Sequence, residues 1–134
     1  MIRLLLVDDH AVVRRALRER LQLEPDLEVV GEAGTGREAL ALAASLAPDV
    51  VLMDIEMPDL DGIQATAELR RVLPRSAVVI LSIHDDVPTR VRALAAGAVA
   101  FVEKRGATQT LIAAVRQAAG RRPDETGGTR DEPI

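Results

Sequence analysis

The sequence predicts an α/β protein with a doubly wound, five-stranded parallel sheet and helices on both faces. Three observations predict this class. Five short aliphatic runs alternate strictly with longer amphipathic segments along the 134 residues. The apolar residues make up 48% of the chain and are nearly all Ala, Leu and Val, with one Phe and no Tyr or Trp, which suits helices packed on a parallel sheet. Strict alternation then requires crossover connections that cover both faces of the sheet.

The predicted strands are short, almost unbroken aliphatic runs. Runs of this kind are typical of strands buried on both faces of a parallel sheet, whereas a strand with one solvated face alternates apolar and polar residues. The runs cover residues 2–7, 27–30, 50–53, 77–81 and 99–102.

The predicted helices lie between and after these strands. In the first, Val12, Ala16 and Leu21 belong to a pattern with three- and four-residue steps, and its arginines are expected to form a solvated face. Asp61 is a predicted N-cap and Gly97 a predicted glycine just after a helix end. The five helices are expected over residues 12–23, 38–46, 63–73, 89–96 and 108–119.

Length and composition indicate one domain followed by a tail. A chain of 134 residues can build one compact core and is too short for two. The domain is expected over residues 1–120. Residues 121–134 are polar, contain Gly-Gly and two prolines, and lack apolar periodicity. We therefore expect this tail to be disordered, either as a linker or as a free terminus.

Charge and composition exclude several classes of function. With 17 Lys and Arg against 21 Asp and Glu, the chain is mildly acidic and should not attract nucleic acid. With a single aromatic residue, the chain also cannot form a base-stacking surface. Without cysteine there is no disulfide, thiol nucleophile or Cys-ligated metal. No signal peptide or apolar run of roughly 20 residues is present, so we expect a cytoplasmic protein with no membrane partner.

Chemically active side chains follow four of the five predicted strands. The first strand leads into Asp8, Asp9 and His10, and the third into Asp54. Open parallel sheets bind ligands at the carboxyl ends of their strands, so these residues should share one edge. The second strand is followed by glycines, Glu32 and Ala33, and is not expected to contribute a comparable group. The fourth and fifth strands add a hydroxyl and an ammonium group, those of Ser82 and Lys104.

Three carboxylates at one edge predict a metal site. Two unit charges about 5 Å apart repel by roughly 3 kcal/mol at an effective dielectric constant of about 20. A hard divalent cation removes this cost, and carboxylate oxygens with several waters suit Mg²⁺. Beside Mg²⁺, a lysine and a serine, Asp54 could act as a nucleophile toward phosphorus. His10 is given no catalytic role because Mg²⁺ prefers oxygen, and His84 is expected to be exposed in a loop.

The joint pattern resembles the receiver domain of bacterial two-component response regulators. The segments LLLVDDH, VVLMDIEMPDLDG, VVILS and GAVAFVEK carry the resemblance, which covers residues 1–120. VVGEAGTGREAL and LSIHDD are similar to the NarL/FixJ (LuxR-type) subgroup. The resemblance implies a flavodoxin-like receiver fold with strand order 2-1-3-4-5. It also implies a sensor histidine kinase as partner, and it leaves open a homodimer that depends on phosphorylation.

The resemblance also implies a role for each site residue. Asp54 would be the phospho-acceptor and also a metal ligand, and Mg²⁺ would be held directly by Asp9 and through water by Asp8. The backbone carbonyl of Glu56 would bind the metal, and Lys104 would bind the phosphoryl group. Ser82 would supply the switch hydroxyl, and Phe101 would be the switch aromatic residue. Phosphorylation would change the surface formed by the fourth helix, fifth strand and fifth helix.

Each assignment has a simpler alternative. Asp8 and Asp9 could merely cap the first helix, Lys104 could be an ordinary surface lysine, and Phe101 could be a plain core residue. The glycines of residues 31–36 are spaced G-x-x-G-x-G, not as in a dinucleotide-binding loop, and are expected to form a loop into the second helix.

The functional alternatives differ in class. The first hypothesis is a receiver that is not an enzyme in its own right. An aspartyl phosphatase would need an acid two residues after the nucleophile to protonate the leaving group. That position is Glu56, directly before Met-Pro, and no substrate-binding insertion follows. The receiver could control transcription through a DNA-binding domain elsewhere in a longer protein, or it could act alone by protein–protein contacts.

Overall fold

The ten predicted strands and helices are all present in the computed structural model, which describes residues 1–83 and 85–120. The predictions for His84 and for the tail, residues 121–134, lie outside the described residues. In chain order the elements are β1 (Ile2–Val7), α1 (Ala11–Leu21), β2 (Leu27–Ala33), α2 (Gly36–Leu46), β3 (Val50–Asp54), α3 (Gly62–Val72), β4 (Ala77–Ser82), α4 (Val87–Ala95), β5 (Ala100–Glu103) and α5 (Thr108–Gly120).

The strands form one parallel sheet in the order β2-β1-β3-β4-β5, which confirms the predicted topology. All residues of β3 and β4 are buried, as expected for central strands covered on both faces. The parallel register pairs Asp54 with Leu81 and Ser82 with Glu103. The carboxyl ends of β3, β4 and β5 therefore lie side by side.

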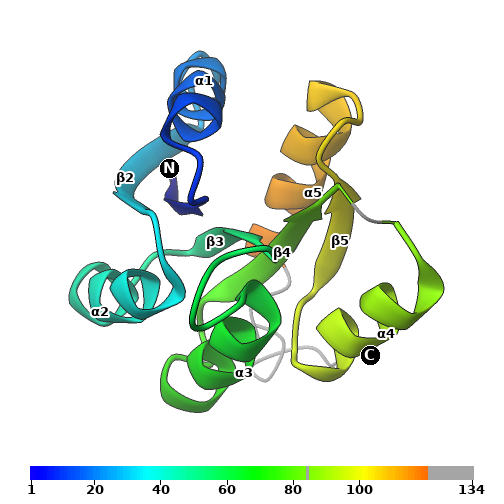
Figure 1. The fold of residues 1–134 in the computed structure, drawn as a ribbon. Coiled ribbons are helices and arrows are strands. Elements are labelled where there is room, and N and C mark those ends of the chain that lie inside the picture. Colours follow the sequence, from blue (N-terminus) through cyan, green and yellow to red (C-terminus); the bar gives the residue numbers. More distant parts are fainter. Residues whose placement is uncertain (84, 121–134) are drawn as a thin grey trace, which may run out of the picture.

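Two helical layers cover the sheet, with α1 and α5 on one face and α2, α3 and α4 on the other (Figure 1). Alternate residues of each strand enter different layers. In β1, Leu5 and Val7 pack toward α2 and α3, whereas Leu4 and Leu6 pack toward α1 and α5. This two-sided burial explains why the strands are aliphatic along their whole length.

Several boundaries differ from the prediction. The glycine-rich segment after residue 30 does not leave the sheet, because Gly31, Glu32 and Ala33 pair with the end of β1. Only Gly34 and Thr35 connect β2 to α2, and the Thr35 hydroxyl caps that helix. Helix α4 begins two residues before the predicted start, since a proline is tolerated in the first turn of a helix.

The predicted helix ends are confirmed at two positions. Asp61 caps α3 and forms a capping box with Gln64. Gly97 follows α4 with a φ of 113°, a left-handed conformation that glycine adopts without steric cost. Among the helices of residues 1–83 and 85–120, none is long and apolar enough to cross a membrane.

Candidate functional site

The predicted acids meet at the carboxyl end of the sheet. Asp8, Asp9, His10 and Asp54 each offer a ligand atom, and these atoms all lie within 4.8 Å of one another. Asp8 and Asp9 follow β1, and Asp54 is the last residue of β3. Because β1 and β3 are adjacent and parallel, their ends deliver the carboxylates to the same place.

The three acids differ in exposure. Asp54 is only 5% exposed and Asp8 3% exposed, whereas the side chain of Asp9 is 30% exposed. The Asp8 carboxylate also closes the turn, since Oδ1 accepts a hydrogen bond from the His10 backbone N–H at 2.8 Å. Asp9 is thus the acid that solvent and a hydrated ion reach most easily, and Asp54 is buried.

Lys104 lies against the two buried acids. Its Nζ is 2.6 Å from Asp8 Oδ2 and 3.6 Å from Asp54 Oδ2. Its backbone N–H donates to the Ser82 carbonyl at 2.8 Å, which fixes the chain as it leaves β5. Burial lowers the pKa of Lys104, but the contacts with Asp8 and Asp54 outweigh it and the net pKa is raised. The ammonium is therefore charged at neutral pH.

The Asp54 carboxyl is held in a state that disfavours its negative charge. Burial raises its pKa, Lys104 opposes this, and the charges of Asp8 and Asp9 add to the increase. The result is a pKa of about 6, compared with 3.8 for an ordinary aspartate. A single lysine does not compensate three crowded acids, so the site favours a further cation.

Arg14 and Glu32 hold the acidic turn from behind. The Arg14 guanidinium donates to the backbone carbonyl of Asp8 and, through Nε, to Glu32 Oε1 at 2.9 Å. Glu32 also pairs with Arg18, and these arginines hold its pKa below the ordinary value despite partial burial. Glu32 at the end of β2 lies outside the acid cluster, as predicted, and supports it only through Arg14. The prediction of a solvated face is wrong for Arg14 and Arg18 of α1, because both are paired with Glu32.

The β3–α3 connection closes tightly over the end of β3. The Gly62 N–H donates to the Ile55 carbonyl at 2.9 Å. A Cβ added at Gly62 would lie 2.0 Å from the Asp54 carbonyl oxygen, so only glycine fits. Glu56 is exposed in this connection, just past the acid cluster, where its backbone carbonyl was predicted to bind metal.

The remaining predicted residues lie on neighbouring strands. Ser82 ends β4 and is 1% exposed. Phe101 lies in β5, packs with the core beneath α2, α3 and α4, and is covered by the Arg90 guanidinium at 4.7 Å from the ring centroid. This distance is within the range of a cation–π contact. Arg90 belongs to α4 and also pairs with Asp85, a link that the sequence gave no reason to expect.

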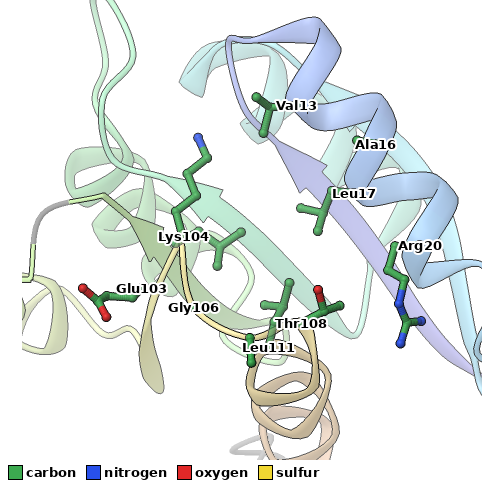
Figure 2. Close-up of a pocket in the computed structure, with 11 residues that line it drawn as sticks. Val13, Ala16, Leu17, Arg20, Glu103, Lys104, Gly106, Thr108 and Leu111 are labelled. Carbon is green, nitrogen blue, oxygen red and sulfur yellow. The ribbon is translucent and has the colours of Figure 1, made fainter.

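A groove adjoins the acidic cluster between α1 and the β5–α5 connection (Figure 2). It has a volume of about 250 Å³ and is lined mainly by apolar side chains, with Lys104 at one edge. In Figure 2, Glu103, the last residue of β5, and Lys104, the residue after it, point in different directions. The ammonium is directed to the strand ends, while the carboxylate of Glu103 points away from them.

The donor set fits a hard divalent cation. The acids provide oxygen ligands, and Asp8 Oδ2 is buried without a hydrogen bond of normal geometry, although Lys104 Nζ is close to it. His10 is the one nitrogen donor, and its Nδ1 is already 3.0 Å from Asp9 Oδ1. His10 was predicted to lie at this edge and was given no catalytic role, because Mg²⁺ prefers oxygen ligands.

Comparison with known proteins identifies the class to which this site belongs. The family model of the response regulator receiver domain matches residues 4–116, and the chain belongs to this family. Relatives include the transcriptional regulatory protein LiaR of Bacillus subtilis, 39% identical over 92% of this chain, and UhpA of Salmonella typhimurium, 43% identical over 89%. The chain spans about three fifths of each relative's length, 58% and 59%.

Solved structures agree with this assignment. The signal receiver domain of the putative response regulator NarL from Mycobacterium tuberculosis is 36% identical, with a TM-score of 0.85 over 90% of this chain and 98% of that one. A LuxR-family response regulator from Aurantimonas is 35% identical, with a TM-score of 0.85 over 91% of this chain and 90% of that one. The chain is therefore a response regulator receiver domain similar to the NarL and LuxR-type regulators.

Proposed function

We propose that Asp54 is the phospho-acceptor of this receiver and that a sensor histidine kinase supplies the phosphoryl group. The observation that carries the proposal is the position of Asp54, which is buried at the end of β3 within reach of Asp8, Asp9 and Lys104. Two nearby acids lie outside this cluster. Asp49, before β3, accepts a hydrogen bond from the Arg3 backbone N–H, and Asp59, in the β3–α3 connection, accepts one from the Arg37 side chain.

The proposed transfer forms an acyl phosphate. An oxygen of the ionised Asp54 attacks phosphorus, and the phosphorus–nitrogen bond to the histidine of the kinase breaks. The electron pair stays on the imidazole, which takes up a proton. Lys104 is close enough to Asp54, at 3.6 Å, to bind an oxygen of the transferred group, and the Ser82 hydroxyl could donate a hydrogen bond to another.

We propose Mg²⁺ as the cation of this site. Asp9 and the backbone carbonyl of Glu56 would bind it directly, and Asp8 would do so through water. When bound, Mg²⁺ would neutralise charge on the phosphoryl oxygens. It would also relieve the repulsion that raises the pKa of Asp54, so that the carboxylate is available as the nucleophile at neutral pH.

The chain is proposed to be a signalling protein and not a turnover enzyme. Its reaction ends with a phosphoryl group on its own side chain, and hydrolysis resets it. A cytoplasmic location, where a kinase would reach it, is part of the proposal. The groove beside Lys104 (Figure 2) is open to solvent next to the acceptor, which suits entry of the kinase histidine from the α1 side.

The output is proposed to be transcriptional control by a longer protein. LiaR and UhpA are transcriptional regulatory proteins by name, and this chain matches only part of each. The acidic receiver itself is not proposed to contact nucleic acid. The alternative output, a stand-alone receiver that acts by protein–protein contacts, would leave the chemistry at Asp54 unchanged.

Acetyl phosphate with Mg²⁺ tests the acceptor directly. We expect intact-protein mass spectrometry to detect one phosphoryl group on the wild type, none on Asp54→Asn, and one on Asp59→Asn, a matched exposed control. Chelation of the divalent cation should prevent uptake. Equal uptake by Asp54→Asn and wild type would show that another residue is the acceptor, and multiple turnover of an unrelated phosphomonoester would favour the phosphatase alternative.

A further inference from the structure

The acid cluster at the carboxyl end of the sheet includes an imidazole that the proposed magnesium chemistry does not use. His10 Nδ1 lies 3.0 Å from Asp9 Oδ1 and 3.4 Å from Asp8 Oδ1. Asp54 also offers an oxygen to this group, and the four ligand atoms all lie within 4.8 Å of one another. The His10 side chain is 66% exposed, so ions reach it from solvent. An imidazole in this position changes which cations the cluster can hold.

The spacing of these donor atoms suits a small four-coordinate cation. Carboxylate oxygens and imidazole nitrogens bind Zn²⁺ at about 2.1 Å, so two donors at a tetrahedral angle are about 3.4 Å apart. The distances from His10 Nδ1 to the oxygens of Asp9 and Asp8, 3.0 and 3.4 Å, are close to this value. The wider separations in the group require a small shift, which the exposed side chains of His10 and Asp9 allow.

A buried oxygen of the cluster also points to a cation. Asp8 is 3% exposed, and its Oδ2 accepts no hydrogen bond from residues 1–83 and 85–120. Lys104 Nζ lies 2.6 Å from this oxygen, but the same ammonium also faces Asp54 at 3.6 Å. A single positive charge therefore faces three carboxylates, and a divalent cation would make the cluster neutral. Buried acceptors without a hydrogen bond are costly, which favours a bound ion here.

We propose that His10 is a fourth ligand beside the three acids, and that it makes the cluster bind Zn²⁺ in preference to Mg²⁺. Mg²⁺ requires near-octahedral oxygen ligands and keeps several waters. Imidazole is a common ligand of Zn²⁺, which also has no strong geometric preference and accepts mixed nitrogen and oxygen donors. The nitrogen of His10 would therefore strengthen zinc binding and add little to magnesium binding. This selectivity does not require Asp54 to accept phosphate.

Four protein ligands would close the site. Structural zinc sites have four protein ligands in a tetrahedron, whereas a site that binds a reacting group keeps one position open. With His10 and the three acids on one cation, no position would remain for a phosphoryl oxygen. We therefore expect zinc to inhibit phosphoryl uptake at Asp54. This consequence, unlike the binding itself, rests on the proposed function.

Isothermal titration calorimetry of the whole chain, with Zn²⁺ and separately with Mg²⁺, tests the selectivity. The wild type should bind Zn²⁺ more tightly than Mg²⁺. His10→Gln should lower the ratio of the two affinities by at least about tenfold, since even partners that only orient a metal ligand contribute this much. His84→Gln removes the other histidine of the sequence and should keep the wild-type ratio.

Three calorimetric results would overturn the proposal. The first is a wild type that binds Zn²⁺ no more tightly than Mg²⁺. The second is an affinity ratio that His10→Gln leaves unchanged. The third is an equal fall of the ratio in His84→Gln, which would place the bound zinc elsewhere in the chain.

Cobalt spectroscopy tests the coordination independently of phosphate chemistry. Co²⁺ binds the same kinds of ligand as Zn²⁺, and tetrahedral Co²⁺ absorbs visible light far more strongly than octahedral Co²⁺. The wild type titrated with Co²⁺ should therefore absorb strongly, and added Zn²⁺ should remove the signal by displacement. His10→Gln should lose most of this absorption. A weak, octahedral spectrum for the wild type would show that His10 does not complete a four-coordinate site.

Uptake from acetyl phosphate separates this proposal from the proposed function. With saturating Mg²⁺, the Zn²⁺ concentration that halves uptake should be at least about tenfold lower for the wild type than for His10→Gln. If the wild type takes up no phosphate even without zinc, the proposed function fails, while calorimetry and the cobalt spectrum still decide the metal proposal. If uptake is normal and zinc inhibits both proteins equally, the role of His10 is overturned and Asp54 remains the acceptor.

Discussion

Two aspartates at opposite ends of β3 have opposite surroundings. Asp49 precedes the strand, and its Oδ2 accepts a hydrogen bond from the Arg3 backbone N–H at 2.8 Å. The Arg3 side chain then binds the carbonyls of Leu46 and Ala47 at the end of α2. Asp54 ends the same strand among other acids, and its pKa is raised to about 6. The acid at the amino end of β3 therefore stabilises the fold, whereas the acid at the carboxyl end lowers stability while it is charged and is the reactive group of the site.

The largest change in stability should come from Gly62, which allows α3 to approach Asp54. In Gly62→Ala the new Cβ would lie 2.0 Å from the Asp54 carbonyl oxygen. We expect the free energy of unfolding to fall by roughly 3 kcal/mol, as overpacking against backbone does. Urea denaturation measures this, with Gly34→Ala as control because its Cβ would meet nothing closer than 3.5 Å. Equal effects would mean that α3 can move away from β3 freely.

Removing the charge of Asp54 should stabilise the protein when divalent cations are absent. We expect Asp54→Asn to raise the free energy of unfolding at pH 7 by up to about 3 kcal/mol, because the pKa of Asp54 rises from 3.8 to about 6 and each pKa unit corresponds to about 1.4 kcal/mol. Urea denaturation in the presence of a chelator measures the change. Saturating Mg²⁺ should reduce or reverse it, because the wild type then gains a bound cation that the variant binds less well.

The same shift fixes the pH dependence. The pKa of Asp54 is higher in the folded protein, about 6, than the unfolded value of 3.8, so the folded state binds the proton more tightly. The protonated Asp54 carboxyl does not destabilise the folded protein at low pH, and stability is lost as the pH rises from about 4 to about 6 and the carboxyl ionises. The difference between Asp54→Asn and wild type should therefore be near zero at pH 4 and reach its full size above pH 6. A constant difference would exclude titration as its cause.

The opposite sign is expected at the amino end of β3. Asp49→Asn keeps the shape of the side chain but removes the charge from its hydrogen bond with the Arg3 N–H. Charged acceptors bind more strongly than neutral ones, so the free energy of unfolding should fall by about 1 kcal/mol. Phosphoryl uptake from acetyl phosphate should be unchanged. A stabilising effect of Asp49→Asn would remove the contrast between the two ends of the strand.

The smallest effect is expected behind the acidic turn. Arg14→Gln loses the guanidinium that binds the Asp8 carbonyl and Glu32, so Asp8 and Asp9 would be held less rigidly. We expect Mg²⁺ affinity to fall by about threefold to tenfold, as for partners that orient metal ligands. Isothermal titration calorimetry measures this, and Arg15→Gln, at the exposed neighbouring residue, serves as the control. Equal affinities for the two variants would limit Arg14 to a structural role.

Much of the fold could be predicted from the sequence because buried parallel strands are aliphatic along their whole length. The strand ends then located Asp8, Asp54 and Lys104 at one edge. The end of β2 was missed because Gly31 and Glu32 are not aliphatic, although they continue the pairing with β1. Their inclusion depends on hydrogen bonds to a neighbouring strand, and local composition does not record such bonds.

The supporting contacts of the site could not be predicted for a related reason. Arg14 and Glu32 are 18 residues apart, and the periodicity of α1 identifies only which of its side chains face the core. Arg90 and Phe101 likewise meet only after α4 and β5 pack together. The sequence pattern located the reactive groups because each follows a predictable strand. The contacts of charged side chains between different elements depend on how those elements pack, which the pattern does not give.

The fold disfavours the charged form of Asp54, and we expect a bound divalent cation to favour that form. Carboxyl carbon NMR of aspartate-labelled protein, with Asp54→Asn for assignment, measures the titration of this group directly. We expect a midpoint near 6 without divalent cations and a clearly lower midpoint with saturating Mg²⁺. A midpoint near the ordinary value of 3.8 in both conditions would contradict it.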